Sequence, residues 1–375
     1  MDSYQTDISR QTVHFLGRRY TAEDILSGRF RSIHDSSALF PSLADFLEEW
    51  FSSSPDVRVQ TSGSTGVPQK LEVEKKRMMH SAMATCRFFH LDEGQKAYLC
   101  MNLKYIGAKM MVVRSLVAGM EIVLAPEVSG RPFQHLEEDL DFAAIVPLQL
   151  FNTLEKEPDR LDRIRTLIVG GGSVDESLLQ RIQGLGTAVY STYGMTETLS
   201  HIALRKLNGP DKSIGYRPLE GISLSRSKDG RLRIEAPLLT DHALLTNDLV
   251  QMEEDGSFLI VGRADNVIVS GGVKLQMEEI EKKLSEILSR KFAITALPHE
   301  KFGEIVLLLV ECPVGFPMEK TELEELKRRM QETLEKYERP KGILSVLEIP
   351  MTETGKIQRS ACRELAMRDK NRIFV

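Results

Sequence analysis

The sequence predicts an α/β protein with a large N-terminal α/β domain and a small C-terminal α+β domain. Short apolar runs alternate with helical patterns between Ala97 and Ile182, which indicates a sheet rich in parallel strands. From Ser213 onward, short segments separated by Asp-Gly turns indicate a hairpin-rich subdomain. After Gly262 the pattern returns to helices and strands. We therefore place the domains at residues 1–264 and 265–375.

The individual elements follow from the spacing of apolar residues. Helical spacing predicts helices at 42–51, 107–118, 278–288 and 320–336, and in the segment after Gly172 as far as Ile182. Short apolar or alternating runs predict strands at 97–101, 122–125, 143–146, 166–169, 222–225, 231–235, 258–261, 293–296 and 305–311. The dipeptides Asp229-Gly230 and Asp255-Gly256 predict tight turns between strands.

Composition narrows the class of protein. The chain has 375 residues, of which 42% are hydrophobic and 27% charged, as in ordinary globular proteins. Its net charge of -5 argues against a general nucleic-acid binder. The four cysteines form no C-x-x-C pair, the N-terminus does not resemble a signal peptide, and the longest apolar runs are too short to span a membrane. We expect a cytoplasmic protein without a membrane or nucleic-acid partner.

A segment rich in glycine and hydroxyl groups follows the strand-like run 57–60. Its residues are Thr61, Ser62, Gly63, Ser64, Thr65 and Gly66. Glycines let backbone N–H groups approach phosphate oxygens, and the hydroxyl groups add donors. No Gly-Lys-Ser/Thr ends the motif, so it is not a Walker A loop. It suits either a phosphate-binding loop or a flexible linker.

Two further segments contain residues suited to nucleotide chemistry. Tyr193-Gly194-Met195-Thr196-Glu197 offers a hydroxyl to a phosphate and a carboxylate to Mg²⁺, although an isolated Thr-Glu pair is more typical of a helix cap. Gly170-Gly171-Gly172 follows a predicted strand and can let a base approach the backbone, or simply form a tight turn.

Three charged residues in the C-terminal part complete the set. Asp248 can accept both hydroxyls of a ribose, and Arg263 can bind ribose or phosphate. Lys356 lies in a Thr-Gly-Lys turn before the last helical segment, where a point charge can stabilise a developing phosphate anion. Each of them alone is more typical of an ordinary surface charge.

Together, in this order, these motifs resemble those of the adenylate-forming superfamily of acyl-CoA synthetases, luciferases and peptide-synthetase adenylation domains. The resemblance covers most of the chain from Thr61 onward, and it assigns the phosphate loop to 61–66, the Y-G-x-T-E signature to 193–197 and the ribose-binding aspartate to Asp248. The G-R-x-D hinge corresponds to 262–265, with Asp265 as pivot, and the adenylation lysine to Lys356.

The resemblance implies a two-step reaction with ATP, Mg²⁺ and CoA. A carboxylate attacks the α-phosphate of ATP, and a thiol then displaces AMP from the acyl-adenylate. It further implies that the small domain is mobile: its rotation removes Lys356 and brings forward the segment with Gly271 and Gly272. Glu197 would bind the metal, and Thr196 would act with it.

The identity of the acid is a separate question, because the motifs bind ATP. The segment 104–114 resembles most closely the compact o-succinylbenzoate–CoA ligases of menaquinone synthesis, and it places Lys104, Tyr105 and Gly107 at the acyl pocket. A dicarboxylic substrate needs a cation for its non-reacting carboxylate. Arg114, on an otherwise apolar predicted helix, is our first choice, with Lys104 and Lys109 as alternatives and a structural role also possible.

The chain departs from the family pattern in several places. The phosphate motif begins early, the Pro-Lys pair after it is shifted at Pro68 and Lys70, and the usual histidine before Gly107 is absent. The few residues after Lys356 favour a free-standing CoA ligase over a peptide-synthetase module. A ligase for another aryl or short to medium-chain acid, an enzyme that uses a carrier protein, and a non-catalytic nucleotide-binding relative stay open. The oligomeric state is not predicted.

Overall fold

The computed structural model describes residues 4–60, 70–314, 318–352, 356–368 and 373–374. The chain divides into two compact units, one formed by residues 1–225, 234–244 and 252–259, the other by 226–233, 245–251 and 260–375. The fold class predicted from the sequence is confirmed, since a large sheet rich in parallel strands is followed by a smaller C-terminal part. The predicted boundary at Asp265 stays a prediction.

A nine-stranded sheet organises the first unit, with strand order β11-β10-β9-β8-β7-β5-β6-β1-β2. Neighbours from β9 to β1 run parallel, whereas β10 pairs antiparallel with β9 and with the edge strand β11, and the other edge strand, β2, pairs antiparallel with β1. The strands are β1 (Val13–Phe15), β2 (Arg18–Tyr20), β5 (Lys96–Leu99), β6 (Glu121–Leu124), β7 (Leu140–Ile145), β8 (Ile164–Val169), β9 (Ala188–Gly194), β10 (His201–Lys206) and β11 (Arg217–Pro218).

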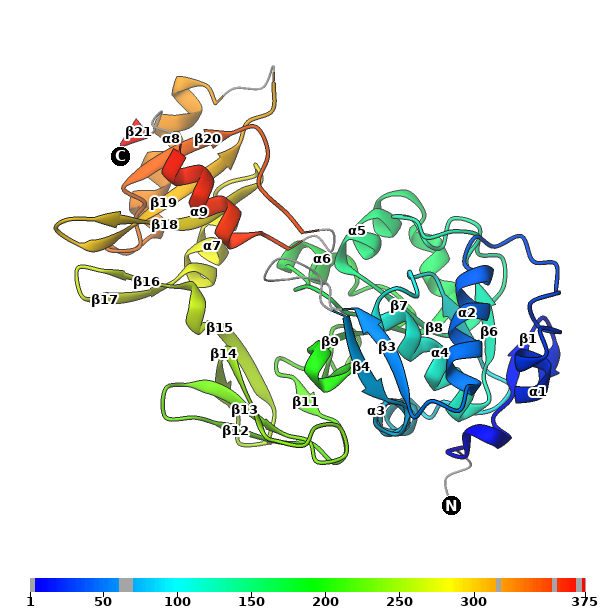
Figure 1. Ribbon diagram of the computed structural model, residues 1–375. Coiled ribbons are helices and arrows are strands. Elements are labelled where there is room, and N and C mark those ends of the chain that lie inside the picture. The colour runs from blue at the N-terminus through cyan, green and yellow to red at the C-terminus, as the bar shows by residue number, and fades with distance from the viewer. Residues whose placement is uncertain (1–3, 61–69, 315–317, 353–355, 369–372, 375) are drawn as a thin grey trace. The chain divides into compact units, whose positions relative to one another are not determined.

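Helices cover this sheet, and a separate antiparallel hairpin, β3 (Asp56–Gln60) with β4 (Lys70–Glu74), lies beside α2 and α4 (Figure 1). The helices are η1 (Ile8–Arg10), α1 (Ala22–Leu26), α2 (Phe40–Phe51), α3 (Lys75–Phe89), α4 (Ile106–Ala118), α5 (Pro147–Lys156), η2 (Pro158–Arg163), α6 (Glu176–Arg181) and η3 (Thr196–Thr198). Every residue of α4 from Ala108 to Ala118 is buried, as expected for a helix that is covered on all sides.

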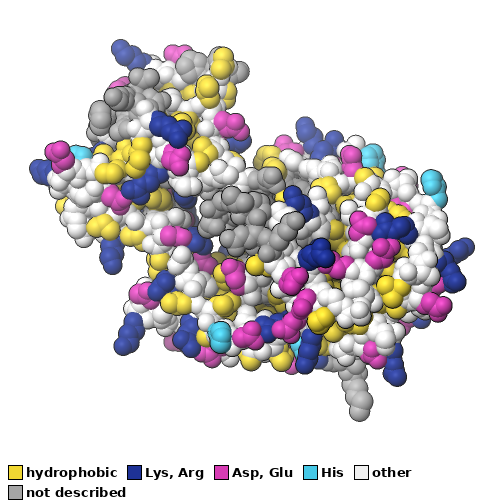
Figure 2. Space-filling view, viewed as in Figure 1, with side chains coloured by type: hydrophobic (Ala, Val, Ile, Leu, Met, Phe, Trp, Pro, Cys, Tyr) yellow, Lys and Arg dark blue, Asp and Glu magenta, His cyan; other side chains and the backbone are white. Residues whose placement is uncertain are grey.

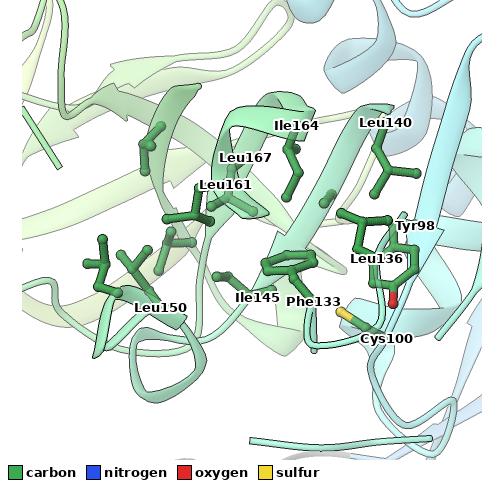
Figure 3. Packing of buried hydrophobic residues seen from close by; sticks show 14 of the residues in the cluster. Tyr98, Cys100, Phe133, Leu136, Leu140, Ile145, Leu150, Leu161, Ile164 and Leu167 are labelled. Carbon is green, nitrogen blue, oxygen red and sulfur yellow. The ribbon is translucent and has the colours of Figure 1, made fainter. Parts of the chain in front are cut away.

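Buried side chains fill the space between the sheet and its helices. Figure 3 shows part of one cluster, in which Tyr98, Phe133 and Ile145 lie close together. The hydroxyl of Tyr98 donates a hydrogen bond to the carbonyl of Pro132 over 2.8 Å, so this buried polar group is satisfied. Such packing holds the parallel strands in register and thereby fixes where each strand ends.

A four-stranded sheet with order β12-β13-β14-β15 follows, and the division between the two units passes through it. Its strands are β12 (Ser223–Arg226), β13 (Arg231–Glu235), β14 (Leu244–Met252) and β15 (Phe258–Arg263). Gly230 and Gly256 both have positive φ, at 89° and 80°, which only glycine adopts without cost. The two Asp-Gly turns predicted from the sequence are confirmed.

The second unit contains a six-stranded sheet in which β17-β16-β19-β20-β21 are neighbours and β18 pairs with β19. Along β19, Val306, Leu308 and Val310 join one core cluster, and the alternating residues join a second, so both faces are covered. The elements are η4 (Ala264–Asn266), β16 (Val267–Ser270), β17 (Val273–Gln276), α7 (Met277–Ser285), β18 (Phe292–His299), β19 (Gly303–Glu311), α8 (Lys320–Thr333), β20 (Gly342–Val346), α9 (Arg359–Arg368) and β21 (Ile373–Phe374).

On the face shown in Figure 2, basic and acidic side chains are interspersed. None of the described helices combines the length and the apolar character that crossing a membrane requires.

Candidate functional site

The site segments of the first unit lie at one edge of the nine-stranded sheet. Strands β5, β8 and β9 belong to its parallel part, so their carboxyl ends share that edge (Figure 1). Lys104 and Tyr105 follow β5, the glycines 170–172 follow β8, and Thr196 and Glu197 follow β9. The chain order reverses at β5, which has β6 on one side and β7 on the other. Ligands of open α/β sheets bind at such a reversal.

The glycine run after β8 is packed closely against β9. The N–H of Gly170 donates to the carbonyl of Ile145 over 3.0 Å, and a Cβ at Gly170 would lie 2.5 Å from Thr192 Oγ1. Gly171 has a φ of 82°, and a Cβ at Gly172 would lie 3.3 Å from Pro147 Cγ. A side chain at Gly170 would collide with Thr192 of β9, and the positive φ of Gly171 favours glycine there.

A tight reversal carries Thr196 and Glu197 from β9 into β10. Gly194 permits it, because a Cβ there would lie 2.3 Å from the carbonyl oxygen of Ser200. Thr198 Oγ1 accepts the N–H of Met195 and hydrogen-bonds with the carbonyl of Ser200, which closes the turn. The turn leaves the carboxylate of Glu197 exposed and Thr196 half-buried. An exposed carboxylate at a strand end can bind a hydrated cation.

Leu199, in the same reversal, is buried although its φ is 66°. A non-glycine residue at positive φ is uncommon and stores strain. Tyr193, just before the turn, packs edge-on against Phe258 with ring centroids 5.1 Å apart. The strained turn is therefore held between packed side chains on both sides.

Arg114 lies in the middle of the buried surface of α4 and is 1% exposed. Its Nη2 donates to Ser200 Oγ over 2.7 Å and its Nη1 contacts Met111 Sδ at 3.7 Å, while Nε has no partner among the described residues. Burial lowers the pKa of Arg114 to about 10. Within the described part of the chain no carboxylate pairs with this guanidinium.

Polar groups that the sequence analysis did not single out surround Arg114. His201 is buried, and its Nε2 lies 2.9 Å from Thr85 Oγ1 on α3. Burial, and secondarily the charge of Arg114, hold the pKa of His201 well below its usual value. Ser81 Oγ, one turn before Thr85, has no partner among the described residues. Ser81 and His201 also line a small pocket with a cavity volume of about 20 Å³.

The remaining acyl-pocket residues lie at the start of α4. Tyr105 is the N-cap residue of this helix, and exposed Lys104 places its Nζ 5.9 Å from the centre of the Tyr105 ring. Gly107 is the second residue of α4, where a Cβ would reach only Met101 Cε, at 3.9 Å. Lys109 is buried and already bound by protein groups, so Arg114 is the better placed of the cations considered for an anionic ligand.

Residues 61–66, expected to grip phosphate, lie outside the described residues. The strand before them is described, and its last residue, Gln60, forms a parallel bridge with Tyr105. The end of β3 is thereby tied to the N-cap residue of α4.

In the second unit the structure brings Asp248, Arg263 and Asp265 into one charged group. Arg263 Nη1 lies 3.1 Å from Asp248 Oδ1, and its Nε and Nη2 donate to Asp265 over 2.8 and 2.7 Å. Asn247 Nδ2 donates to Asp265 over 3.4 Å. The hydrogen bonds to Asp265 raise the pKa of Arg263, and those from Arg263 lower the pKa of Asp265.

Lys356 lies near this group. The N–H of Lys356 donates to Thr352 Oγ1 over 3.0 Å, and the N–H of Thr352 donates to the carbonyl of Lys356 over 2.7 Å. Restricted solvation and the charge of Arg263 lower the pKa of Lys356, which Asp248 partly opposes. Residues 353–355 lie outside the described residues.

Three glycines of the second unit are required by backbone conformation or by close packing. Gly271 and Gly272, with φ of 60° and 84°, form the two-residue turn of the β16–β17 hairpin. A Cβ at Gly262 would lie 2.3 Å from Gln276 Cδ. Gln276, which the sequence analysis missed, donates to the carbonyl of Arg263 over 2.9 Å and so braces the segment before Asp265.

Comparison with known proteins gives the family. The model of the AMP-binding enzyme family matches residues 59–224. A 2-succinylbenzoate–CoA ligase of Lactococcus lactis is 30% identical over 338 residues, which cover 84% of this chain and 71% of the relative. The chain belongs to the AMP-binding family of adenylate-forming enzymes. The resemblance inferred from the sequence motifs is confirmed.

Other proteins similar to this adenylate-forming enzyme are consistent with the same family. A 2-succinylbenzoate–CoA ligase of Listeria monocytogenes is 25% identical over 346 residues, covering 85% of this chain and 72% of the relative. The structure of an acyl-CoA synthetase (AMP-forming)/AMP-acid ligase II-like protein from Dyadobacter fermentans is 33% identical with a TM-score of 0.60, covering 88% and 95% of the two chains. The fold also matches Bacillus subtilis o-succinylbenzoate CoA synthetase with ATP and magnesium, with a TM-score of 0.73, 17% identity, and coverage of 93% and 96%.

Proposed function

We propose that this enzyme activates o-succinylbenzoate with ATP and transfers it to CoA, releasing AMP and pyrophosphate. The relatives from Lactococcus lactis and Listeria monocytogenes carry the name of this ligase, and one structure of the same fold was solved with ATP and magnesium. The observation that carries the choice of acid is Arg114, a buried guanidinium with an unpaired Nε and no carboxylate partner among the described residues. A substrate with a second carboxylate supplies the missing charge.

In the first step the acid carboxylate attacks the α-phosphorus of ATP and pyrophosphate leaves. Residues 61–66 bind phosphate oxygens, the glycines 170–172 let the base approach the backbone, and Asp248 with Arg263 binds the ribose. Lys356 stabilises the negative charge that develops on the α-phosphate. Tyr193, Gly194 and Thr196 shape the strand end at which the acid and the α-phosphate meet.

Mg²⁺ neutralises phosphate charge when it is bound. No cluster of three or more His, Cys, Asp or Glu residues suited to a metal occurs among the described residues. That fits Mg²⁺, which commonly uses one or two carboxylates together with substrate phosphates. Glu197, exposed after β9, is the carboxylate that would hold it.

In the second step the CoA thiolate attacks the acyl carbon and AMP leaves. We propose that residues 265–375 form a mobile lid that turns at Asp265, withdraws Lys356 and presents Gly271 and Gly272 to the pantetheine. The Arg263–Asp265 ion pair spans this pivot, so it must rearrange when the lid turns. CoA as acceptor, rather than a carrier protein, follows the names of the relatives.

The choice of acid is tested by comparing o-succinylbenzoate with its monocarboxylic analogues, each of which lacks one of the two carboxylates. We expect acid-dependent pyrophosphate release with o-succinylbenzoate, and a KM raised on the order of 100-fold for Arg114→Met because a charge-assisted hydrogen bond is lost in a buried site. Arg114→Lys keeps the charge and should recover part of the loss. Equal use of the monocarboxylic analogues by the wild-type enzyme would overturn the assignment.

A further inference from the structure

Lys109 is the second cation buried on α4, and it faces a different partner from Arg114. It is 8% exposed and lies five residues before Arg114, or one turn after Tyr105. Its Nζ donates to the backbone carbonyl of Arg58 over 2.5 Å and lies 3.4 Å from Glu49 Oε2. The same ammonium lies 5.0 Å from the centre of the Phe46 ring. Burial lowers its pKa, and the charge of Glu49 opposes this.

Glu49 completes the arrangement from α2. Its Oε1 accepts the backbone N–H of Arg58 over 2.9 Å, while its Oε2 faces Lys109. Both backbone polar groups of Arg58 are therefore bound by side chains. In β3, Arg58 is opposite Glu72 of β4, but its N–H and carbonyl point away from β4 toward these two residues. Glu49 and Lys109 thus occupy the place of a neighbouring strand at the free edge of β3.

The same edge is held again two residues later. Gln60 forms its parallel bridge with Tyr105, the N-cap residue of α4. Residues i and i+2 of a strand present their backbone groups to the same side, so Arg58 and Gln60 form one continuous edge. Tyr105 and Lys109 are one helical turn apart and so lie on one face of α4. Figure 1 shows the β3–β4 hairpin beside α2 and α4.

We propose that Glu49 and Lys109 are positioning residues that fix β3, and with it the entry to the nucleotide-binding segment, against the helix that carries Arg114. Gln60 is the last residue of β3 and directly precedes Thr61. A displaced Arg58 would shift the direction in which the chain enters 61–66. The inference rests on the proposed function in one respect, namely that ATP is the ligand of residues 61–66. It implies that α4, the helix that carries Arg114, supports β3, the strand that leads to this segment.

The test is binding of a non-hydrolysable ATP analogue with Mg²⁺ to purified full-length variants, measured by calorimetry without any acid. Lys109→Met removes the donor and keeps the volume. We expect its Kd for the analogue to rise roughly tenfold, because small displacements of a binding group weaken binding strongly. Lys109→Arg, which still reaches a carbonyl and a carboxylate, should restore most of the affinity. In half-reaction kinetics the KM for ATP should rise while the KM for the acid stays the same.

A matched control separates positioning from general stability. Lys75 is also buried, has a pKa lowered by burial, and donates through Nζ to a backbone carbonyl, that of Ser52, over 2.9 Å. Lys75→Met should lower the melting temperature as much as Lys109→Met and leave nucleotide affinity unchanged. Glu49→Gln gives a second variant: hydrogen exchange of the Arg58 amide should accelerate and nucleotide affinity should fall.

The outcomes are distinguishable. If the wild-type protein does not bind the analogue, the proposed function fails. If the wild type binds it and folded Lys109→Met and Glu49→Gln bind it equally well, the positioning role is overturned. The positioning role is also overturned if Lys75→Met loses as much affinity for the analogue, or if Lys109→Arg does not restore the affinity. In either case the loss of affinity would follow from lower stability alone.

Discussion

The two units hold their site residues in different ways. In the first, the polar side chains of Lys109, Arg114 and His201 are buried and hydrogen-bonded to other protein groups. In the second, the charges of Asp248, Arg263 and Asp265 are partly exposed and pair with one another. Substitutions in the first unit should therefore cost stability and activity together, whereas those in the second should cost activity with little loss of stability.

The largest loss of activity is expected from Lys356→Ala. This variant tests whether substitutions in the second unit reduce activity with little loss of stability. Lys356 is a turn residue whose side chain has no carboxylate in salt-bridge contact among the described residues, so the unfolding midpoint should not move. Adenylate formation should fall by about 10²–10³-fold, as for loss of a group that stabilises developing charge. Thioester formation from supplied acyl-adenylate should be largely preserved. Stopped-flow measurement of each half-reaction, with Lys336→Ala as control, checks this, and equal losses in both steps would contradict it.

Gly194→Ala tests the first unit in the same way. The new Cβ would lie 2.3 Å from the carbonyl oxygen of Ser200, a backbone atom in a closed turn. We expect unfolding to become easier by about 2–3 kcal/mol, in the range of overpacked sites, and adenylation to fall as Thr196 and Glu197 move. Gly184→Ala is the matched control, since nothing lies within 4 Å of a Cβ there. Denaturant titration of both variants measures their free energies of unfolding. A Gly194→Ala protein as stable as the control would show that this turn is not constrained.

The buried side chain of His201 should make the stability of the first unit depend on pH. Because the pKa of His201 is held well below 6.5 in the folded protein, the unfolded chain binds a proton first as the pH falls. Stability should therefore decline below about pH 6.5, at most by about 1.4 kcal/mol per pH unit for this one group. His201→Gln should flatten the profile between pH 7 and 5, while replacement of exposed His135 by Gln should not. Identical profiles for His201→Gln and wild type would contradict a buried neutral imidazole.

Only a small change in stability is expected for Arg263→Met. Its side chain is 43% exposed, and exposed ion pairs contribute at most about 1 kcal/mol. Affinity for ATP should nevertheless fall, because Asp248, which we propose binds the ribose, loses its partner Arg263. Calorimetric titration with the ATP analogue, paired with thermal unfolding, measures both. A loss of several kcal/mol of stability would show that this pair belongs to the core, and the contrast between the units would then disappear.

Much of the fold could be predicted from the sequence because its core strands are continuous apolar runs. The segments around β5, β7, β8 and α4 are typical of buried elements, and the Asp-Gly turns are confirmed by positive φ at Gly230 and Gly256. Helix α3 was not anticipated, because its buried face includes Met78, Ser81 and Thr85 instead of a stripe of large aliphatic residues. Packing against α4 and β10 determines that helix, and a single sequence does not show that packing.

Candidate site residues could be predicted where they belong to motifs that resemble those of a known family. The resemblance to the family singled out Asp248, Arg263 and Lys356; the structure places them together in the second unit, and their roles stay predictions. The residues that support the site could not be predicted. Glu49, Lys109 and Arg58 are far apart in the sequence, and their hydrogen bonds depend on how two helices and a hairpin pack. The sequence named Lys109 only as an alternative partner for the acid, and no pattern pointed to Glu49 or to Ser200.

The most direct test of acid activation is mass spectrometry of the wild-type enzyme incubated with ATP, Mg²⁺, CoA and o-succinylbenzoate. The account predicts a CoA thioester of the acid and an equal amount of AMP, both of which require the acid. ADP in place of AMP, or AMP without a thioester, would contradict it.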